Sequence, residues 1–401
     1  MRRWVLAAGL MALLAGCAAE TPPQPPTTWP LGQTAGGPTA LPNALAPLQY
    51  NVCELGFTML RDLAASRSGD IFISPAAAAV ALALLHEAAA AHEGPRLREL
   101  CGLGGLAARD VTSNAEALRE MLLRPGAGVT SQASMSVWLP AGHTISTAFA
   151  SVSRGRYKAR VRAGDFSSPG ARDAIDRWFR QVSVQKVPTA PLPPPPEDMF
   201  LGANALVHGS WTDPPAQADT RPGTFTAADG TTRTMDFMHQ TTTARYADLG
   251  RAQRLDLPLG GGKVCLTLLR PTADDGLQPL LERLTPERWA EATTEGRMVT
   301  AEVALPKLEM VDVTRLDDVL RIDGLDVSAA SNKPLHLGQL WLVTPLIIDE
   351  WGLNATPPIS APSEDPGPMP DDQVSFRADR PFAFIVTQAA GNLPLYAGVI
   401  R

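Results

Sequence analysis

The amino-acid sequence predicts an α+β fold in which an N-terminal helical region precedes large, mostly antiparallel sheets. Two observations predict this class. Apolar residues spaced by three and four dominate the first part of the folded region, and from about residue 199 strand-like apolar runs separated by Gly, Pro and Asp turns take over. Helices followed by strands are typical of α+β proteins and not of doubly wound α/β folds. No second linker interrupts this region, so we expect one domain over residues 48–401.

The first residues, 1–16, have the features of a bacterial lipoprotein signal peptide. Arg2 and Arg3 precede an apolar run that is too short to cross a bilayer, and the run ends in Leu-Ala-Gly directly before Cys17. In such signals the cysteine is lipidated and becomes the new N-terminus. The alternative is an ordinary signal peptide with an incidental cysteine. We expect a secreted protein that a lipid on Cys17 anchors at the bacterial cell envelope, in the periplasm or on the cell surface.

Residues 17–47 are predicted to form a tether. The segment is rich in Pro and Thr and has no periodic apolar pattern, so it cannot bury enough surface to offset the entropy lost on ordering. The whole chain has 41 acidic against 35 basic side chains. An acidic chain is a poor match for nucleic acid, which we therefore exclude as a partner.

Cysteine and histidine usage predicts no metal site and no cofactor. The chain has no C-x-x-C pair, and its six histidines are scattered. Beyond Cys17 three cysteines remain, so at most one pair can form in an oxidising compartment. Cys53 and Cys101 are both predicted at helix ends and could form that pair. Cys265, in the apolar run VCLTLL, is expected to be a buried thiol.

The predicted elements follow in chain order. Residues Leu48–Leu63 carry apolar side chains at helical spacing, and Asp70–Ser74 is a short strand. Ser74 and the proline after it suit the cap and first turn of a buried, Ala-rich helix that extends to about residue 91. Ser168 and the proline after it begin another helix in the same way. The strand-like runs are MFLGANALVHGSW, AQRLDLPL, KVCLTLLRP, MVTAEVALPKL, LWLVTPLIID and FAFIVTQ.

Several of these segments, in their order along the chain, resemble the serpin family, and the resemblance extends from about residue 48 to the end. The matching segments are DIFISPAAAAVALALL, ARDAIDRWFRQVSVQKV, LGANALVHGSW, LDLPL, VALPKL and FRADRPFAFIVTQAAGNLPLYAGVI. The resemblance implies a serpin fold with an exposed reactive loop, and inhibition of an extracellular serine or cysteine protease in place of an enzyme activity. In this family the protease cuts the loop and forms an acyl-enzyme. The cut loop then inserts as a new central strand and distorts the protease.

The resemblance also implies roles for individual residues. Glu350-Trp351-Gly352 matches the Glu-x-Gly with which the loop hinge begins. The implied hinge residues are Glu350, Gly352, Leu353, Asn354, Ala355 and Thr356, and the implied scissile region is Pro366, Gly367, Pro368 and Met369. Ser74 and Asn204 match half of a hydrogen-bond network under the opening sheet, whose other positions are Ala77 and Leu342 here. Trp211 is expected to pack near the top of that sheet.

Prolines separate this sequence from the inhibitory pattern. A central strand needs an N–H from each residue that pairs, and Pro357, Pro358 and Pro345 have none. Each unpaired buried group costs roughly 1 to 3 kcal/mol. The bait itself, SEDPGPMPDD, is typical of a solvated acidic loop. Two hypotheses stay open: a suicide inhibitor that tolerates the prolines, and a non-inhibitory serpin-fold binding module or scaffold. The expected partner is a protease or another extracellular protein.

Two short matches to enzyme motifs do not extend. Ser183–Lys186 has the S-x-x-K spacing of penicillin-binding enzymes, but no lysine of the chain is followed by Thr-Gly or Ser-Gly. Leu259–Val264 contains three glycines and a lysine but lacks the Ser or Thr of a phosphate loop, so a hairpin turn is expected there. The sequence therefore predicts no catalytic residues.

Overall fold

The structure is a computed structural model that describes residues 46–100, 107–126, 128–184, 197–272, 276–355, 369–389 and 392–401. Cys17, with the predicted signal and nearly all of the predicted tether, lies outside these residues. So do Cys101, Thr356, Pro366, Gly367 and Pro368. Among the described residues, no helix combines the length and the apolar character that crossing a bilayer requires.

Helices concentrate in the first half of the chain, as the sequence predicts. The α-helices of the described residues are α1 (Ala46–Ser66), α2 (Pro75–Ala88), α3 (Gly94–Leu100), α4 (Ala108–Leu123), α5 (Thr147–Gly155), α6 (Pro169–Val182), α7 (Leu277–Arg283), α8 (Pro286–Thr294) and α9 (Leu316–Leu320). Short 3-10 turns are η1 (Gln217–Asp219), η2 (Gly260–Gly262) and η3 (Ser328–Ala330). Ser74 and Ser168 cap α2 and α6, and each is followed by a proline in the first turn, which confirms both predicted starts.

The strands form two sheets. The six-stranded sheet has the order β10 (Leu308–Arg315), β11 (His336–Asp349), β12 (Gly352–Leu353), β4 (Asp198–Ser210), β2 (Val129–Pro140), β3 (Arg160–Gly164). The nine-stranded sheet has the order β1 (Ile71–Ile73), β15 (Leu393–Ile400), β14 (Phe382–Gln388), β8 (Val264–Pro271), β7 (Ala252–Leu259), β6 (Thr232–Asp248), β9 (Arg297–Pro306), β13 (Gln373–Arg377), and β5 (Arg221–Thr226) pairs with β6. Only the pairs β4–β11, β2–β3 and β9–β13 are parallel among those described. The predicted α+β class is confirmed.

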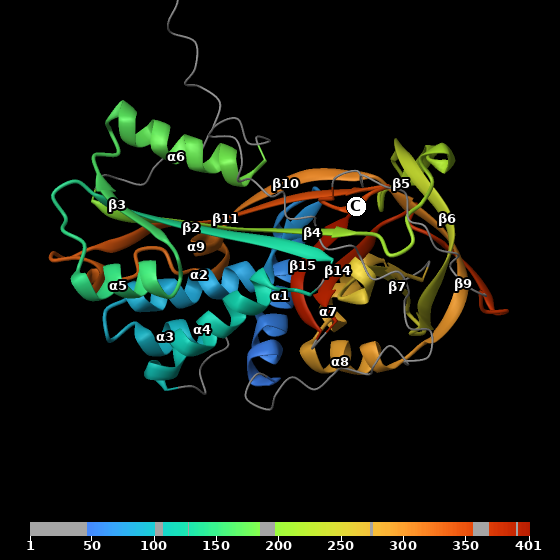
Figure 1. Cartoon of the computed structure of the whole chain (residues 1–401), viewed down its shortest axis with the longest axis horizontal. Coiled ribbons are helices and arrows are strands. Elements are labelled where there is room, and N and C mark those ends of the chain that lie inside the picture. The colour runs from blue at the N-terminus through green and yellow to red at the C-terminus, as the bar shows by residue number, and fades with distance from the viewer. Residues whose placement is uncertain are drawn as a thin grey trace, which may run out of the picture.

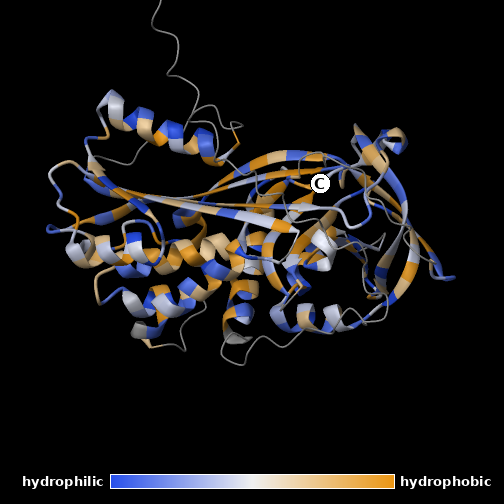
Figure 2. Ribbon diagram, viewed as in Figure 1, coloured by the Kyte–Doolittle hydropathy of each residue, from blue (hydrophilic) through white to orange (hydrophobic). Residues whose placement is uncertain are grey.

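Helices cover both faces of the six-stranded sheet. Figure 1 shows α2 to α5 on one side of it and α6 alone on the other. Almost all of α2 is buried, and Figure 2 shows it as a nearly continuous hydrophobic helix. A helix that is apolar on all sides belongs in a core, and α2 lies between this sheet and β15. By contrast, α6 buries one stripe, made of Ile175, Trp178, Phe179 and Val182, against the outer face of the sheet.

The structure corrects one expectation about the cysteines. Cys53 lies two turns inside α1, not at a helix end, because α1 already begins at Ala46. It is a free thiol with 2% of its surface exposed, and Cys101, its predicted partner, is outside the described residues. Burial raises the pKa of Cys53 to about 12. Cys265 is also free, but it is half-buried and not fully buried as predicted.

Candidate functional site: a slot in the six-stranded sheet

The two central strands of the six-stranded sheet pair over only part of their length. β4 and β11 run parallel and are paired from Asp198 and His336 up to Asn204 and Val343. Above this last rung they separate, so that residues 205–208 of β4 face residues 344–347 of β11 without a ladder. We call this opening in the ladder the slot. The short strand β12 closes its upper end, paired with β11 on one side and β4 on the other.

β12 is the first part of the predicted loop hinge, folded back into the sheet. After β11 ends at Asp349 the chain turns over two residues, and Gly352 then pairs with both Asp349 and Ser210. Its φ is +134°, a region that side chains rarely adopt, and a Cβ atom there would overlap with the carbonyl oxygen of Gly209. Glycine is thus required at this turn. Leu353 follows and is buried, with 1% of its surface exposed.

Glu350 anchors the turn from the side. Its carboxylate accepts a hydrogen bond from Lys307 Nζ at 2.8 Å and another from Thr220 Oγ1 at 2.7 Å. Burial opposes ionisation of Glu350, but these two donors outweigh it and leave the pKa of Glu350 below its ordinary value. The same hydrogen bond raises the pKa of Lys307. The hinge is therefore held by an ionised pair at neutral pH.

We expect acid to release this anchor. Because the pKa of Glu350 is lowered in the folded protein, its contribution to stability is complete above about pH 4.3, the ordinary glutamate value, and is lost as pH falls through the folded pKa. The raised pKa of Lys307 makes its contribution complete below about pH 10.4 and lost as pH rises beyond its folded value. Glu350→Gln should cost roughly 1 to 2 kcal/mol at neutral pH, since the lysine is partly exposed.

Urea unfolding midpoints measured from neutral pH down to roughly pH 3 test this prediction. Glu350→Gln should reduce the fall of the urea midpoint at acid pH. Glu302→Gln, a substitution at an exposed residue of β9, should leave that fall unchanged. An identical fall in the wild type and in Glu350→Gln would contradict the assignment.

Trp211, the residue after β4, contacts the same turn. Its indole nitrogen donates to the carbonyl oxygen of Asp349 at 2.7 Å, and its backbone N–H donates to Trp351 at 3.3 Å. The side chain is buried, at the upper end of the slot. Its predicted role where a loop would enter the sheet stays a prediction.

Asn354 follows β12. Its side chain makes the hydrogen bonds to β4 and β11 that the next residue pair of a longer strand would make. The amide nitrogen donates to Val207 O at 2.9 Å, and the amide oxygen accepts from Ile347 N at 2.7 Å. The Asn354 backbone N–H donates to Ile347 O at 2.7 Å, and its carbonyl oxygen accepts a hydrogen bond from His208 Nδ1. With φ at +48°, Asn354 leaves the extended conformation. It therefore links β4 to β11 and stops the strand at the same point.

Replacing Asn354 by glycine should open this link without adding backbone strain, because glycine tolerates a positive φ. The Ile347 N–H would lose its acceptor, so its hydrogen exchange should accelerate at least about tenfold, corresponding to about 1.4 kcal/mol of local stability. Exchange measured by NMR or by mass spectrometry of the β11 peptide tests this. Asn354→Asp keeps the acceptor oxygen and should leave Ile347 more protected than in Asn354→Gly. Equal protection in wild type and Asn354→Gly would contradict the proposed link.

Two further side chains fill the lower part of the slot. Tyr396, fully buried in β15, accepts a hydrogen bond from Val207 N at 2.7 Å and donates its hydroxyl to Ala205 O at 3.1 Å. At the last paired rung of β4 and β11, the Asn204 side-chain amide donates to Val343 O at 2.9 Å and to Val182 O at 3.0 Å. Side-chain groups thus pair backbone groups that a further strand would otherwise pair.

Ser74 hydrogen-bonds within α2 and to β15. Its hydroxyl accepts from Ala77 N at 3.3 Å and donates to Leu395 O at 2.7 Å, one residue before Tyr396. The Asn204 side-chain amide donates its hydrogen bonds to carbonyl groups of β11 and α6. The two residues therefore have separate partners, and Tyr396 takes the central place under the slot. No local pattern in the sequence distinguishes Tyr396 from the other tyrosines, because its hydrogen bonds depend on the packing of β15 against β4.

The register of β12 shows what a longer inserted strand would meet. Leu353 lies between Ile348 and Gly209, so each following loop residue would meet the preceding residue of both strands. Trp351 O accepts from β4, whereas Asn354 N donates to β11. Odd-numbered loop residues thus direct their backbone groups to β4 and even-numbered ones to β11.

Three successive rungs of such a strand would each lack a donor. Thr356 would stand opposite Pro345, which offers it no N–H. Pro357 would face Ala205 O without a donor, and Pro358 would face Val343 O without one. Pro345 is tolerated in β11 because its backbone faces the slot. The backbone carbonyl of Val343 and the N–H of Ile347 point into the slot, and alternate residues of a strand direct their backbone groups the same way, so Pro345 lacks an N–H on the slot side and not on the side of β10.

The far end of the loop is fastened to β9. Thr300 donates its hydroxyl to Pro370 O at 2.6 Å and its N–H to Asp372 O at 2.8 Å, and Asp372 pairs with Arg297. Met369, from the predicted scissile region, has 39% of its surface exposed. The bond after it precedes Pro370. Ala355 is half-buried at the mouth of the slot, and the predicted roles of these residues stay predictions.

Comparison with known proteins matches residues 50–401 to a family model described as Serpin (serine protease inhibitor). A putative serpin-Z5 of Oryza sativa subsp. japonica is 28% identical over 411 residues, covering 90% of this chain and 91% of the relative. Two solved structures share the fold. The thermophilic serpin tengpin in its native state has a TM-score of 0.78 at 17% identity, covering 88% of this chain and 93% of its own. Human thyroxine-binding globulin complexed with thyroxine has a TM-score of 0.79 at 17% identity, covering 88% and 98%.

Proposed function

The chain belongs to the serpin family, and we propose that it is a non-inhibitory member, a binding module for an extracellular protein. Members of this family generally inhibit proteases by loop cleavage and insertion. In this chain a protease that cuts the loop would leave as a free enzyme, because the loop cannot travel down the sheet before the acyl-enzyme is hydrolysed. The protein would be a substrate of that protease and not a trap for it.

The single observation that carries this proposal is the run of three donor-less rungs directly below Asn354. Each buried backbone group left without a partner costs roughly 1 to 3 kcal/mol, so the three together oppose insertion by roughly 3 to 9 kcal/mol. Insertion would also remove the bonds that Asn204 and Tyr396 make with the slot. The fold is compatible with a binding role, since thyroxine-binding globulin carries a ligand on the same architecture.

We propose further that the protein acts at the bacterial cell envelope, anchored by a lipid on Cys17 and held away from the membrane by the tether of residues 17–47. The pattern before Cys17 supports this placement. Metabolic labelling with a palmitate analogue should mark the wild type and not Cys17→Ala. Labelling that persists in Cys17→Ala, or is absent from both, would refute the anchor.

Incubation with subtilisin and with papain, a serine and a cysteine protease of broad specificity, tests the proposed function. We expect loop cleavage, full recovery of protease activity, and no complex that survives denaturing electrophoresis. A stoichiometric covalent complex would overturn the proposal. A complex formed by Pro345→Thr/Pro357→Ala/Pro358→Ala and absent in the wild type would confirm that the prolines are the cause.

One observation favours the second candidate, a working inhibitor. β12 is already paired on both sides, so the first step of insertion has been taken in the intact chain. On this hypothesis β4 and β11 would separate further once cleavage frees the loop, and the loop would insert between them. The covalent complex with the wild type is the result that would establish it.

A further inference from the structure

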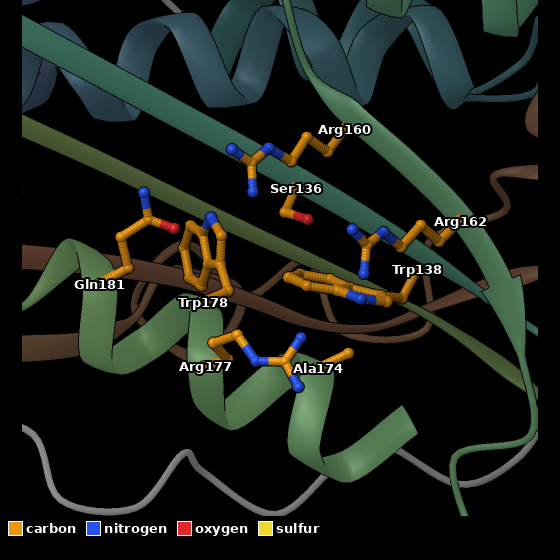
Figure 3. A pocket seen from close by; sticks show the side chains of 8 residues that line it. All are labelled: Ser136, Trp138, Arg160, Arg162, Ala174, Arg177, Trp178 and Gln181. Carbon is orange, nitrogen blue, oxygen red and sulfur yellow. The ribbon is translucent and has the colours of Figure 1, made fainter. Parts of the chain in front are cut away.

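A small cavity lies between α6 and the edge of the six-stranded sheet, away from the slot. Its volume is about 60 Å³, and Figure 3 shows the side chains that line it. The sheet contributes Ser136 and Trp138 from β2 and Arg160 and Arg162 from β3. The helix contributes one face, at spacings of three and four: Ala174, Arg177, Trp178 and Gln181.

The strand register explains why the sheet residues meet here. Arg160 pairs with Ser136, and Arg162 pairs with Trp138. Directly paired residues of adjacent strands point to the same face, and alternate residues along a strand do so as well. Both arginines of β3 therefore stand on the face that α6 covers, and Arg177 lines the same cavity from the helix, with the Trp138 ring between it and Arg162 in the view of Figure 3.

Three positive charges at this cavity have no counter-charge. Among the described residues, no carboxylate forms an ion pair with Arg160, Arg162 or Arg177, and none of the three guanidinium groups makes a side-chain hydrogen bond. The chain as a whole carries a formal charge of −6, so acidic partners are not scarce. All three arginine side chains are exposed to solvent, but they line one recess.

Two indole N–H groups at the floor of the cavity also lack an acceptor. Trp138 and Trp178 are each 4% exposed, and their indole nitrogens are buried without a hydrogen-bond partner in the described part of the chain. In Figure 3 the indole nitrogen of Trp178 lies on the side of Ser136 and Arg160, and that of Trp138 on the side of Arg162. Buried tryptophan N–H groups normally find a partner. Every charged group and both indoles at this site are donors, so the partner that is missing is an acceptor with negative charge.

We propose that this cavity binds one phosphate or sulfate group. Guanidinium forks and N–H donors that approach from the strand, the sheet floor and the helix suit a tetrahedral oxyanion, which accepts from several directions, better than a planar carboxylate. A water needs roughly 10 to 15 Å³ of such volume, so the cavity has room for the few heavy atoms of one such group and not for a larger molecule. The ligand is a free ion in this proposal.

Binding here would tie α6 to the edge strand. Phe179, next to Trp178 in α6, lies across the seam of the sheet, with ring centroids 6.1 Å from Phe200 of β4 and 6.4 Å from Trp341 of β11. An oxyanion shared by Arg177 and the β3 arginines adds a link between the helix and β3. The ion should therefore raise the melting temperature in proportion to the logarithm of its concentration once above the dissociation constant.

Titration of the full chain with sodium phosphate and with sodium sulfate, at an ionic strength held constant with sodium chloride, tests the site. We expect a saturable change in tryptophan fluorescence and a rise in melting temperature. Arg162→Gln and Arg177→Gln should each weaken the affinity at least tenfold. Arg172→Gln, on the exposed side of α6, is the matched control and should bind as the wild type does.

Each other outcome speaks against the proposal. Equal affinity in Arg162→Gln and the wild type, or a shift that chloride reproduces, would overturn it. A second arm uses vesicles of phosphatidylglycerol against vesicles of phosphatidylcholine. Binding to the anionic vesicles that requires Arg162 and Arg177, without any response to free phosphate or sulfate, would place the group on a lipid head and refute the free ion as ligand.

Discussion

Cleavage of the loop is expected to leave the melting temperature of the wild type within about 2 °C of the intact protein, whereas Pro345→Thr/Pro357→Ala/Pro358→Ala should gain about 10 to 30 °C on the same cleavage. The wild-type strand stops at Asn354, because the next three rungs each lack a donor. Restoring the three missing N–H donors recovers roughly 3 to 9 kcal/mol of stability in the inserted form. Each kcal/mol corresponds to about 2 to 4 °C in melting temperature for a large domain. The strand could then extend to Ala361.

Calorimetry on intact and nicked forms of both proteins measures this effect, with the cut between Pro358 and Asp372 located by mass spectrometry. Pro362→Ala is the matched control. It removes a loop proline that lies beyond the blocked rungs, so its nicked form should melt as the nicked wild type does. A large rise in the wild type would show that the sheet accommodates the prolines, and the non-inhibitory proposal would then fail.

Tyr396→Phe is expected to destabilise the fold by about 2 to 4 kcal/mol. The ring stays, but Val207 N loses its acceptor and Ala205 O its donor, and both are backbone groups at the buried edge of β4. No cavity forms, so the measured loss reports on the slot alone. Hydrogen exchange at Val207 should accelerate in parallel with the lower urea midpoint.

Tyr50→Phe provides the comparison for this measurement. Tyr50 is 44% exposed and hydrogen-bonds to Glu287 at the surface, so its loss should change stability by less than about 0.5 kcal/mol. Equal effects of the two substitutions would mean that the hydroxyl of Tyr396 is not needed to pair the open edge of β4.

Much of the fold follows from local patterns in the sequence. The helical spacing in α1, the Ser-Pro starts of α2 and α6 and the later series of apolar runs all report on short stretches of chain, and the structure agrees with them. The expectation for Cys53 failed at a helix boundary, which is the feature that local patterns specify least. The first part of the predicted bait, residues 363–368, is outside what the structure describes.

Less of the candidate site than of the fold could be predicted from the sequence. The resemblance to the family pointed to Glu350 and Gly352, and residue chemistry alone singled out the three prolines, because a proline has no N–H in any context. Only the tertiary structure decided which backbone groups those prolines would leave unpaired, since that depends on the register of β12 against two strands distant in sequence. It also decided that Asn354 and Tyr396 pair the open edges, and that three arginines meet two tryptophans under α6. Such contacts join residues tens to hundreds of positions apart, and no local pattern encodes them.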